Sequence, residues 1–147
     1  MSEKESTSKK RTHFLIYTLI IILAAFLVSM IMVLTREDPE DVYRKNSNIR
    51  VEVLNGCGVD RTAIKVTNQL RKQGFNVVRI GDALKQDFEE TVIIERRDEE
   101  MKNARYFARY FRCDNLSKDI DPALYLEITV IIGKDYKRIF RNVEKEL

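Results

Sequence analysis

Polar and apolar residues separate sharply in the first third of the chain. The 21 residues Phe14–Leu34 contain no charged side chain. An α-helix of that length rises about 31 Å, which matches the ~30 Å hydrocarbon core of a bilayer. Lipid offers no hydrogen-bond partners to the backbone, so a helix is the conformation expected there. The pattern predicts one transmembrane helix over residues 14–34.

Charges on the two sides of this span differ. Four basic residues precede it, namely Lys4, Lys9, Lys10 and Arg11. Arg36 follows it and leads directly into the acidic residues Glu37, Asp38, Glu40 and Asp41. Lys and Arg are retained in the cytoplasm, so we expect a cytoplasmic basic tail over residues 1–13 and the rest of the chain outside the cytoplasmic (inner) membrane. A cleaved signal peptide is the alternative, but this apolar run is longer than the usual ~7–15 residues and lacks a small-residue cleavage site.

Beyond the span, a polar stretch with Pro39 predicts a linker over residues 35–48. The hydrophobic period then switches between two and 3.6 residues, which predicts alternating strands and helices. Strands are expected at 49–54, 75–80, 91–95 and 126–132, and helices at 61–73 and 99–112, with Asp60 and Asp98 as their N-caps. The segment 115–125 reads as irregular, and the charged tail 137–147 as a short helix or a frayed end.

The predicted order is β-α-β-β-α-β. This order indicates an α+β fold, a two-layer sandwich most simply of ferredoxin-like topology, with both helices on one face of the sheet. The chain has room for one such domain, over residues 49–136.

The charge balance of the outer part is nearly neutral. Residues 14–147 carry 22 basic and 21 acidic side chains. Such a domain has no broad positive field to attract nucleic acid. The expected strands 49–54 and 91–95 also lack the aromatic residues on which RNA-recognition modules of similar order stack bases. We therefore expect no nucleic-acid partner.

Four short motifs follow one another along the outer part of the chain. They are Val51–Gly58 followed by Ala63, then Gly74-Phe75, then Asp87-Phe88 with Thr91–Ile93, and finally Val130–Tyr136. Together they resemble the LytR C-terminal domain, the small module found after the catalytic domain of LytR–CpsA–Psr envelope proteins. The family usually has Gly-Leu where this chain has Arg61-Thr62. The resemblance covers residues 49–136 and implies a stand-alone, membrane-anchored, non-catalytic module, because the larger catalytic domain is missing.

Two features are candidates for ligand binding. The turn formed by Asn55, Gly56 and Gly58 leads into a helix N-terminus, whose N–H groups could hold a phosphate or carboxylate. The competing interpretation is a plain tight turn. Arg105 and Arg109 lie one helical turn apart, in line with Arg112, and could contact anionic polymers, glycans or lipid head groups. Here the competing interpretation is a solvated helix face.

The chain has two cysteines, Cys57 and Cys113. Outside the cytoplasm they could form a disulfide, and otherwise they are two separate, partly buried thiols. The only histidine, His13, precedes the membrane span, so neither cysteine has a base on its own side of the membrane. We expect no catalytic residues, no metal site and no cofactor.

These features predict a single-pass envelope protein whose outer domain binds a wall polymer, peptidoglycan or another envelope protein. The alternatives are an accessory subunit or enzyme of cell-wall glycopolymer transfer, and a SPOR-like peptidoglycan binder.

Overall fold

The computed structural model describes residues 2–35, 38–141 and 143, with side chains from His13 onward. The side chains of the basic tail, Arg36, Glu37 and residues 142 and 144–147 of the expected C-terminal tail lie outside the described part. The chain divides into two compact units, Met1–Asp38 and Pro39–Leu147.

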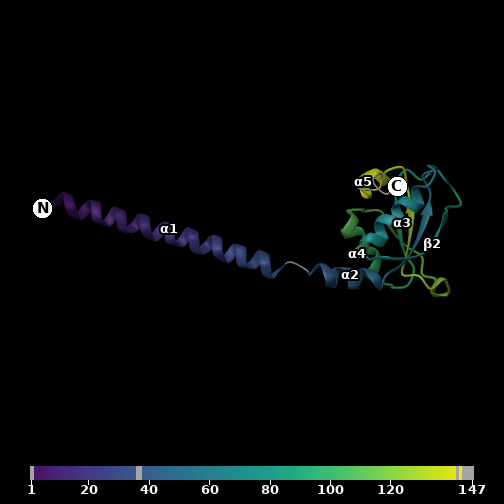
Figure 1. Cartoon of the computed structure of the whole chain (residues 1–147), viewed down its shortest axis with the longest axis horizontal. Helices are drawn as coiled ribbons and strands as arrows, with labels where there is room; N and C mark the ends of the chain where they lie inside the picture. Colours follow the sequence, from purple (N-terminus) through teal and green to yellow (C-terminus); the bar gives the residue numbers. More distant parts are fainter. Residues whose placement is uncertain (1, 36–37, 142, 144–147) are drawn as a thin grey trace. The chain divides into compact units, whose positions relative to one another are not determined.

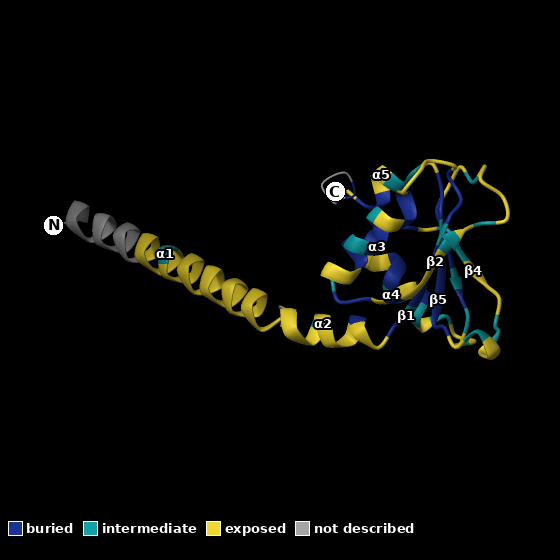
Figure 2. Ribbon diagram, turned by 45° about the vertical axis from the view of Figure 1, so that its right-hand side comes forward, coloured by how far each residue is buried: buried dark blue, intermediate teal, exposed yellow. Residues whose placement is uncertain are grey.

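The first unit consists of helix α1, Ser2–Leu34 (Figure 1). Its large apolar side chains from Phe14 to Leu34 are all exposed, as the colouring of Figure 2 shows. The most apolar window of this helical stretch has a mean hydropathy of 2.8, and none of it is buried. By length and composition, α1 is a candidate membrane span.

The second unit contains the remaining elements. These are α2 (Pro39–Ser47), β1 (Arg50–Asn55), α3 (Thr62–Lys72), β2 (Asn76–Asp82), β3 (Val92–Glu95), α4 (Lys102–Phe111), β4 (Leu116–Lys118), the 3₁₀ turn η1 (Pro122–Leu124), β5 (Ile128–Ile132) and α5 (Tyr136–Ile139). The expected α+β class is confirmed. Most of the expected linker is helix α2, which belongs to this unit.

The strands form one mixed sheet in the order β2-β1-β5-β3-β4. Strand β1 pairs in parallel with β2 and with β5, while β3 runs antiparallel to β5 and parallel to β4. The ferredoxin-like topology is therefore wrong, because that topology places another strand between the two strands of each β-α-β unit. Here β1-α3-β2 and β3-α4-β4 each join adjacent parallel strands. The additional strand β4 lies in the segment expected to be irregular.

Helices α3 and α4 cover one face of the sheet (Figure 2). Fully buried aliphatic side chains from the strands face them, including Val51, Val53, Ile93 and Val130. Ala63, Val66 and Leu70 of α3 and Ala104, Ala108 and Phe111 of α4 are buried. Phe111 packs against Phe107 and Phe140, with ring centroids 4.5 and 5.2 Å apart. Aromatic contacts therefore contribute to the core on the helix side of the sheet.

The N-termini of α3 and α4 differ in part from the expected capping by Asp60 and Asp98. Asp60 does not cap α3, because Arg61 occupies the N-cap position in a left-handed conformation with no side-chain cap. At the start of α4, the Asp98 carboxylate accepts hydrogen bonds from the N–H groups of Glu100 and Lys102, both at 3.1 Å. The buried Glu95 carboxylate adds a bond from the Ala104 N–H at 2.8 Å. Two carboxylates thus satisfy the N-terminus of α4.

Candidate functional site

Helix α2 is fixed to the domain by one buried amide. The Asn46 side chain is fully buried at the C-terminal end of α2. Its Nδ2 donates to the Gln73 carbonyl oxygen at 2.6 Å, and its Oδ1 accepts from the Tyr106 hydroxyl at 2.8 Å. Asn46 therefore holds α2 beside the end of α3 and the middle of α4.

A groove of about 470 Å³ lies between α2 and α4. Its lining residues are Lys45, Asn48, Ile49, Lys102, Asn103, Arg105, Tyr106 and Arg109. Four of these eight are basic and none is acidic, so this surface favours an anion although the domain as a whole is nearly neutral.

Arg105 and Arg109 present the strongest binding groups of this basic groove. Both are exposed, and within the described part of the chain neither side chain makes a hydrogen bond or an ion pair. Asp98 lies close enough to Arg105 for the cation to contribute to lowering the Asp98 pKa, after the larger effect of the backbone hydrogen bond from Glu100. Each guanidinium can offer a planar fork of N–H donors to a phosphate or carboxylate.

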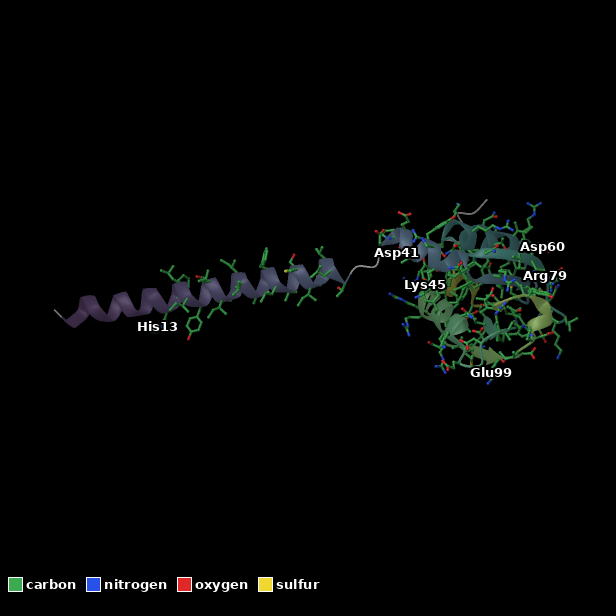
Figure 3. All side chains as sticks on the ribbon, turned by 90° about the horizontal axis from the view of Figure 1, so that it is seen from below. His13, Asp41, Lys45, Asp60, Arg79 and Glu99 are labelled. Carbon is green, nitrogen blue, oxygen red and sulfur yellow. The ribbon has the colours of Figure 1, made fainter. Side chains whose placement is uncertain are left out.

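The two lysines of the groove are held in different ways. The Lys45 ammonium lies 4.2 Å from the centroid of the Tyr106 ring, which is a cation–π contact. Figure 3 labels Lys45 on the globular domain. The Lys102 ammonium bonds to the Glu100 carboxylate at 2.8 Å, and this hydrogen bond raises the pKa of Lys102. Lys102 therefore stays charged at neutral pH.

The Asn55 side chain and the backbone groups of Gly56 are used within the fold. Asn55 Oδ1 accepts from the Cys57 N–H at 3.3 Å, and Asn55 Nδ2 donates to the Val59 carbonyl at 3.1 Å. A Cβ at Gly56 would lie 2.8 Å from Ile131, and Gly58 has a φ of +72°. These features account for both glycines by close packing and turn geometry, without a ligand.

The turn and the basic groove lie at opposite ends of β1. Asn48 and Ile49 of the groove precede the strand, whereas Asn55 is its last residue. Six residues of strand span about 20 Å. The structure therefore brings Arg105 and Arg109 together, and leaves Asn55, Gly56 and Gly58 apart from them.

Cys57 and Cys113 are both free and buried. The Cys57 thiol contacts Asn55 Oδ1 at 3.2 Å, and the Cys113 thiol contacts the Thr91 carbonyl at 3.5 Å. Burial raises the pKa of Cys113, which keeps its thiol protonated and unreactive. Of the two interpretations of these cysteines, the structure shows separate thiols.

Lys45 and Lys102 were not among the expected site residues. Lys45 was missed because residues 35–48 read as a linker. A helix signal was nevertheless present, since Pro39 stands at the first helical position, Glu40 and Asp41 follow it, and Arg44 and Lys45 occupy the last turn. Only the fold, however, shows that this helix packs beside α4.

The family model described as "LytR cell envelope-related transcriptional attenuator" matches residues 48–136. The chain belongs to this family. Searches of curated proteins and of solved structures found no match. The family module is a non-catalytic, cell-envelope-associated domain. The match begins after α2. Lys45 therefore lines the basic groove although it lies outside the matched LytR C-terminal region.

Proposed function

We propose that the protein is a single-pass cell-envelope protein whose LytR C-terminal domain lies outside the cytoplasm and binds an anionic envelope component without catalysis. The observation that carries this proposal is the pair of guanidinium groups, Arg105 and Arg109, which lack protein partners in the described chain and lie over the basic groove. Exposed cations without partners at a concave surface favour binding of phosphate or carboxylate groups.

The composition of the groove supports binding rather than chemistry. Its lining has no carboxylate, histidine or cysteine that could serve as a general base or nucleophile. An enzyme of glycopolymer transfer would need such groups next to its anion site. The groove therefore favours a docking role on an anionic wall polymer.

Sedimentation with cell-wall sacculi tests this proposal. The full chain is kept in lipid nanodiscs and mixed with sacculi, either intact or stripped of their anionic polymers by acid. We expect retention on intact sacculi only. The double variant Arg105→Ala/Arg109→Ala should bind at least about tenfold more weakly, because each charged hydrogen-bonding contact contributes about 1.5–3 kcal/mol.

Two further variants separate local recognition from general charge. Arg105→Lys/Arg109→Lys keeps the charge but removes the planar forks, so we expect intermediate binding. Lys65→Ala/Lys85→Ala removes the same charge elsewhere on the surface and should leave binding unchanged. Equal losses in the two alanine variants, or equal retention on stripped sacculi, would contradict the proposal.

A further inference from the structure

A second hollow, of about 250 Å³, lies at the C-terminal ends of α3 and α4. Residues from α3, α4 and the segment around α5 line it, and it shares no residue with the basic groove. We call it the glutamine hollow, after Gln69 and Gln73 of its lining. Any ligand bound there would be separate from the anion of the proposed function.

The two glutamines have an unusual environment. Gln69 is only 6% exposed, and its Oε1 atom has no hydrogen-bond partner within the described chain. The Oε1 atom of Gln73, one helical turn later, is also buried and without a partner there. Buried polar atoms in folded proteins are nearly always hydrogen-bonded. Both glutamines line the hollow, so a hydrogen-bond donor from outside the chain could reach their amide oxygens once the side chains rotate toward it.

The same hollow also carries positive charge. Arg112 and Arg141 line it, both are exposed, and neither side chain makes an ion pair or hydrogen bond within the described residues. The Tyr110 ring, which packs against Phe75 and Phe111 with centroids 5.6 and 5.0 Å away, forms a fixed wall between the helices. The glutamine hollow therefore combines two buried acceptors with two exposed guanidinium groups.

We propose that the glutamine hollow binds the free carboxyl end of a peptide. The peptide N–H groups would donate to the amide oxygens of Gln69 and Gln73, and the terminal carboxylate would accept from Arg112 and Arg141. A neutral sugar supplies hydroxyl donors but no anion for the arginines. Inorganic phosphate supplies an anion but no N–H groups for the glutamines. A peptide carboxyl end carries both.

Nuclear magnetic resonance on the full chain in nanodiscs of zwitterionic lipid tests this proposal. The probe is N-acetyl-Ala-Ala, and its C-terminal amide and N-acetylglucosamine are the comparison ligands. We expect saturable shifts of the Gln69 and Gln73 side-chain amide signals with the free acid, and at least about tenfold weaker binding of the other two. No saturable shift, or equal binding of the peptide amide or the sugar, would overturn the proposal.

A variant gives a second, independent readout. Gln69→Met removes the amide at nearly constant length. We expect binding of the free acid to fall about tenfold and the urea midpoint of unfolding to rise, because a buried atom without a partner is removed. Gln86→Met, in an exposed loop, should change neither quantity. A lower urea midpoint for Gln69→Met would mean that the amide makes structural hydrogen bonds, which would overturn the proposal.

Discussion

Gly133 is the most tightly confined glycine of the domain. A Cβ atom there would lie 2.2 Å from the carbonyl carbon of Glu90 and 2.6 Å from the Thr91 nitrogen. The Gly133 N–H donates to Thr91 Oγ1 at 3.1 Å, and Thr91 Oγ1 donates to Asp135 at 2.8 Å. The residue after β5 thus lies in close contact with the backbone that precedes β3. Only glycine fits there, because a Cβ atom would overlap that backbone.

We predict that Gly133→Ala lowers the free energy of unfolding by at least about 3 kcal/mol, since backbone atoms must move to admit the methyl group. Urea unfolding of the full chain in detergent micelles, followed by near-ultraviolet circular dichroism, measures this change. Gly81→Ala is the matched control, because its Cβ would meet only Leu54 Cδ2 at 3.5 Å. A loss at Gly133 no larger than that at Gly81 would contradict this prediction.

Glu127 forms the best-defined ion pair of the domain. Its carboxylate accepts from Arg50 Nε at 3.0 Å, from Arg50 Nη2 at 2.9 Å and from the Arg50 backbone N–H at 2.7 Å. Burial alone would raise the pKa of Glu127, but the hydrogen bonds and charge of Arg50 outweigh it and lower the pKa. The ionised carboxylate therefore stabilises the folded state.

This lowered pKa predicts the sign of a pH effect. The folded state resists protonation of Glu127 more than the unfolded chain does, so the stabilisation is present above the unfolded pKa of about 4.3 and is lost as pH falls through the folded pKa. Glu127→Gln should cost about 2 kcal/mol at pH 7, and its difference from the wild type should shrink below about pH 4.

Urea titrations at several pH values measure that difference. Glu99→Gln is the control, because the Glu99–Lys118 pair is largely exposed and contributes at most about 1 kcal/mol. A difference between wild type and Glu127→Gln that stays constant with pH would show that the carboxylate is not the source of the stabilisation.

Helix α2 illustrates how an element depends on its surroundings. It has nine residues, and an isolated helix of that length is marginal in water. Its acidic first turn and basic last turn favour helix formation, but the buried Asn46 bonds are what hold it against α3 and α4. The basic groove exists only while α2 is docked, since Lys45 lines one side of it.

We predict that Asn46→Ala releases α2 and weakens the groove. The substitution leaves the Tyr106 hydroxyl and the Gln73 carbonyl without their partner, at a cost of about 1–3 kcal/mol each if they stay buried. Hydrogen exchange should become faster over residues 39–49, with little change in β1 and β5. Ser47→Ala is the control, because the exposed Ser47 hydroxyl bonds only within α2. Unchanged protection of α2 in Asn46→Ala would refute this explanation.

Elements with a clear hydrophobic period were predicted well from the sequence, and elements without such a period were not. Strand β1 alternates and strand β5 is apolar except for Thr129, and the predicted segments 49–54 and 126–132 overlap them. Strand β4 has only three residues, two of them exposed, so no alternation could reveal it. It forms because the β3 edge offers backbone partners, with Ile93 facing Leu116.

For the whole molecule, the charges around the candidate membrane span predict the orientation. With basic residues before the span, the globular domain should be digested by protease added to spheroplasts. Replacing Lys4, Lys9, Lys10 and Arg11 with serine should protect a fraction of the molecules, because the retention signal is lost. Lys65→Ala/Lys85→Ala should leave digestion unchanged. A wild-type domain that resists protease until lysis would contradict the proposed orientation.

The candidate site was only half predictable. Arg105 and Arg109 could be found from their spacing on one helix, because neighbours one turn apart on a helix are a property of local sequence. Lys45 joins them from a helix about 60 residues earlier, and nothing local indicates that pairing. The turn at Asn55 had a plausible local pattern, and in the structure its Asn55 side chain bonds to Cys57 and Val59 within the fold.

The sequence alone determined the apolar span, the α+β alternation and the LytR C-terminal motifs, because hydrophobic period and chain order are local, one-dimensional properties. Only the tertiary structure decided the strand order, the docking of α2, the basic groove and the glutamine hollow. Each of these depends on which distant surfaces meet, and that choice is made by the packing of the whole core.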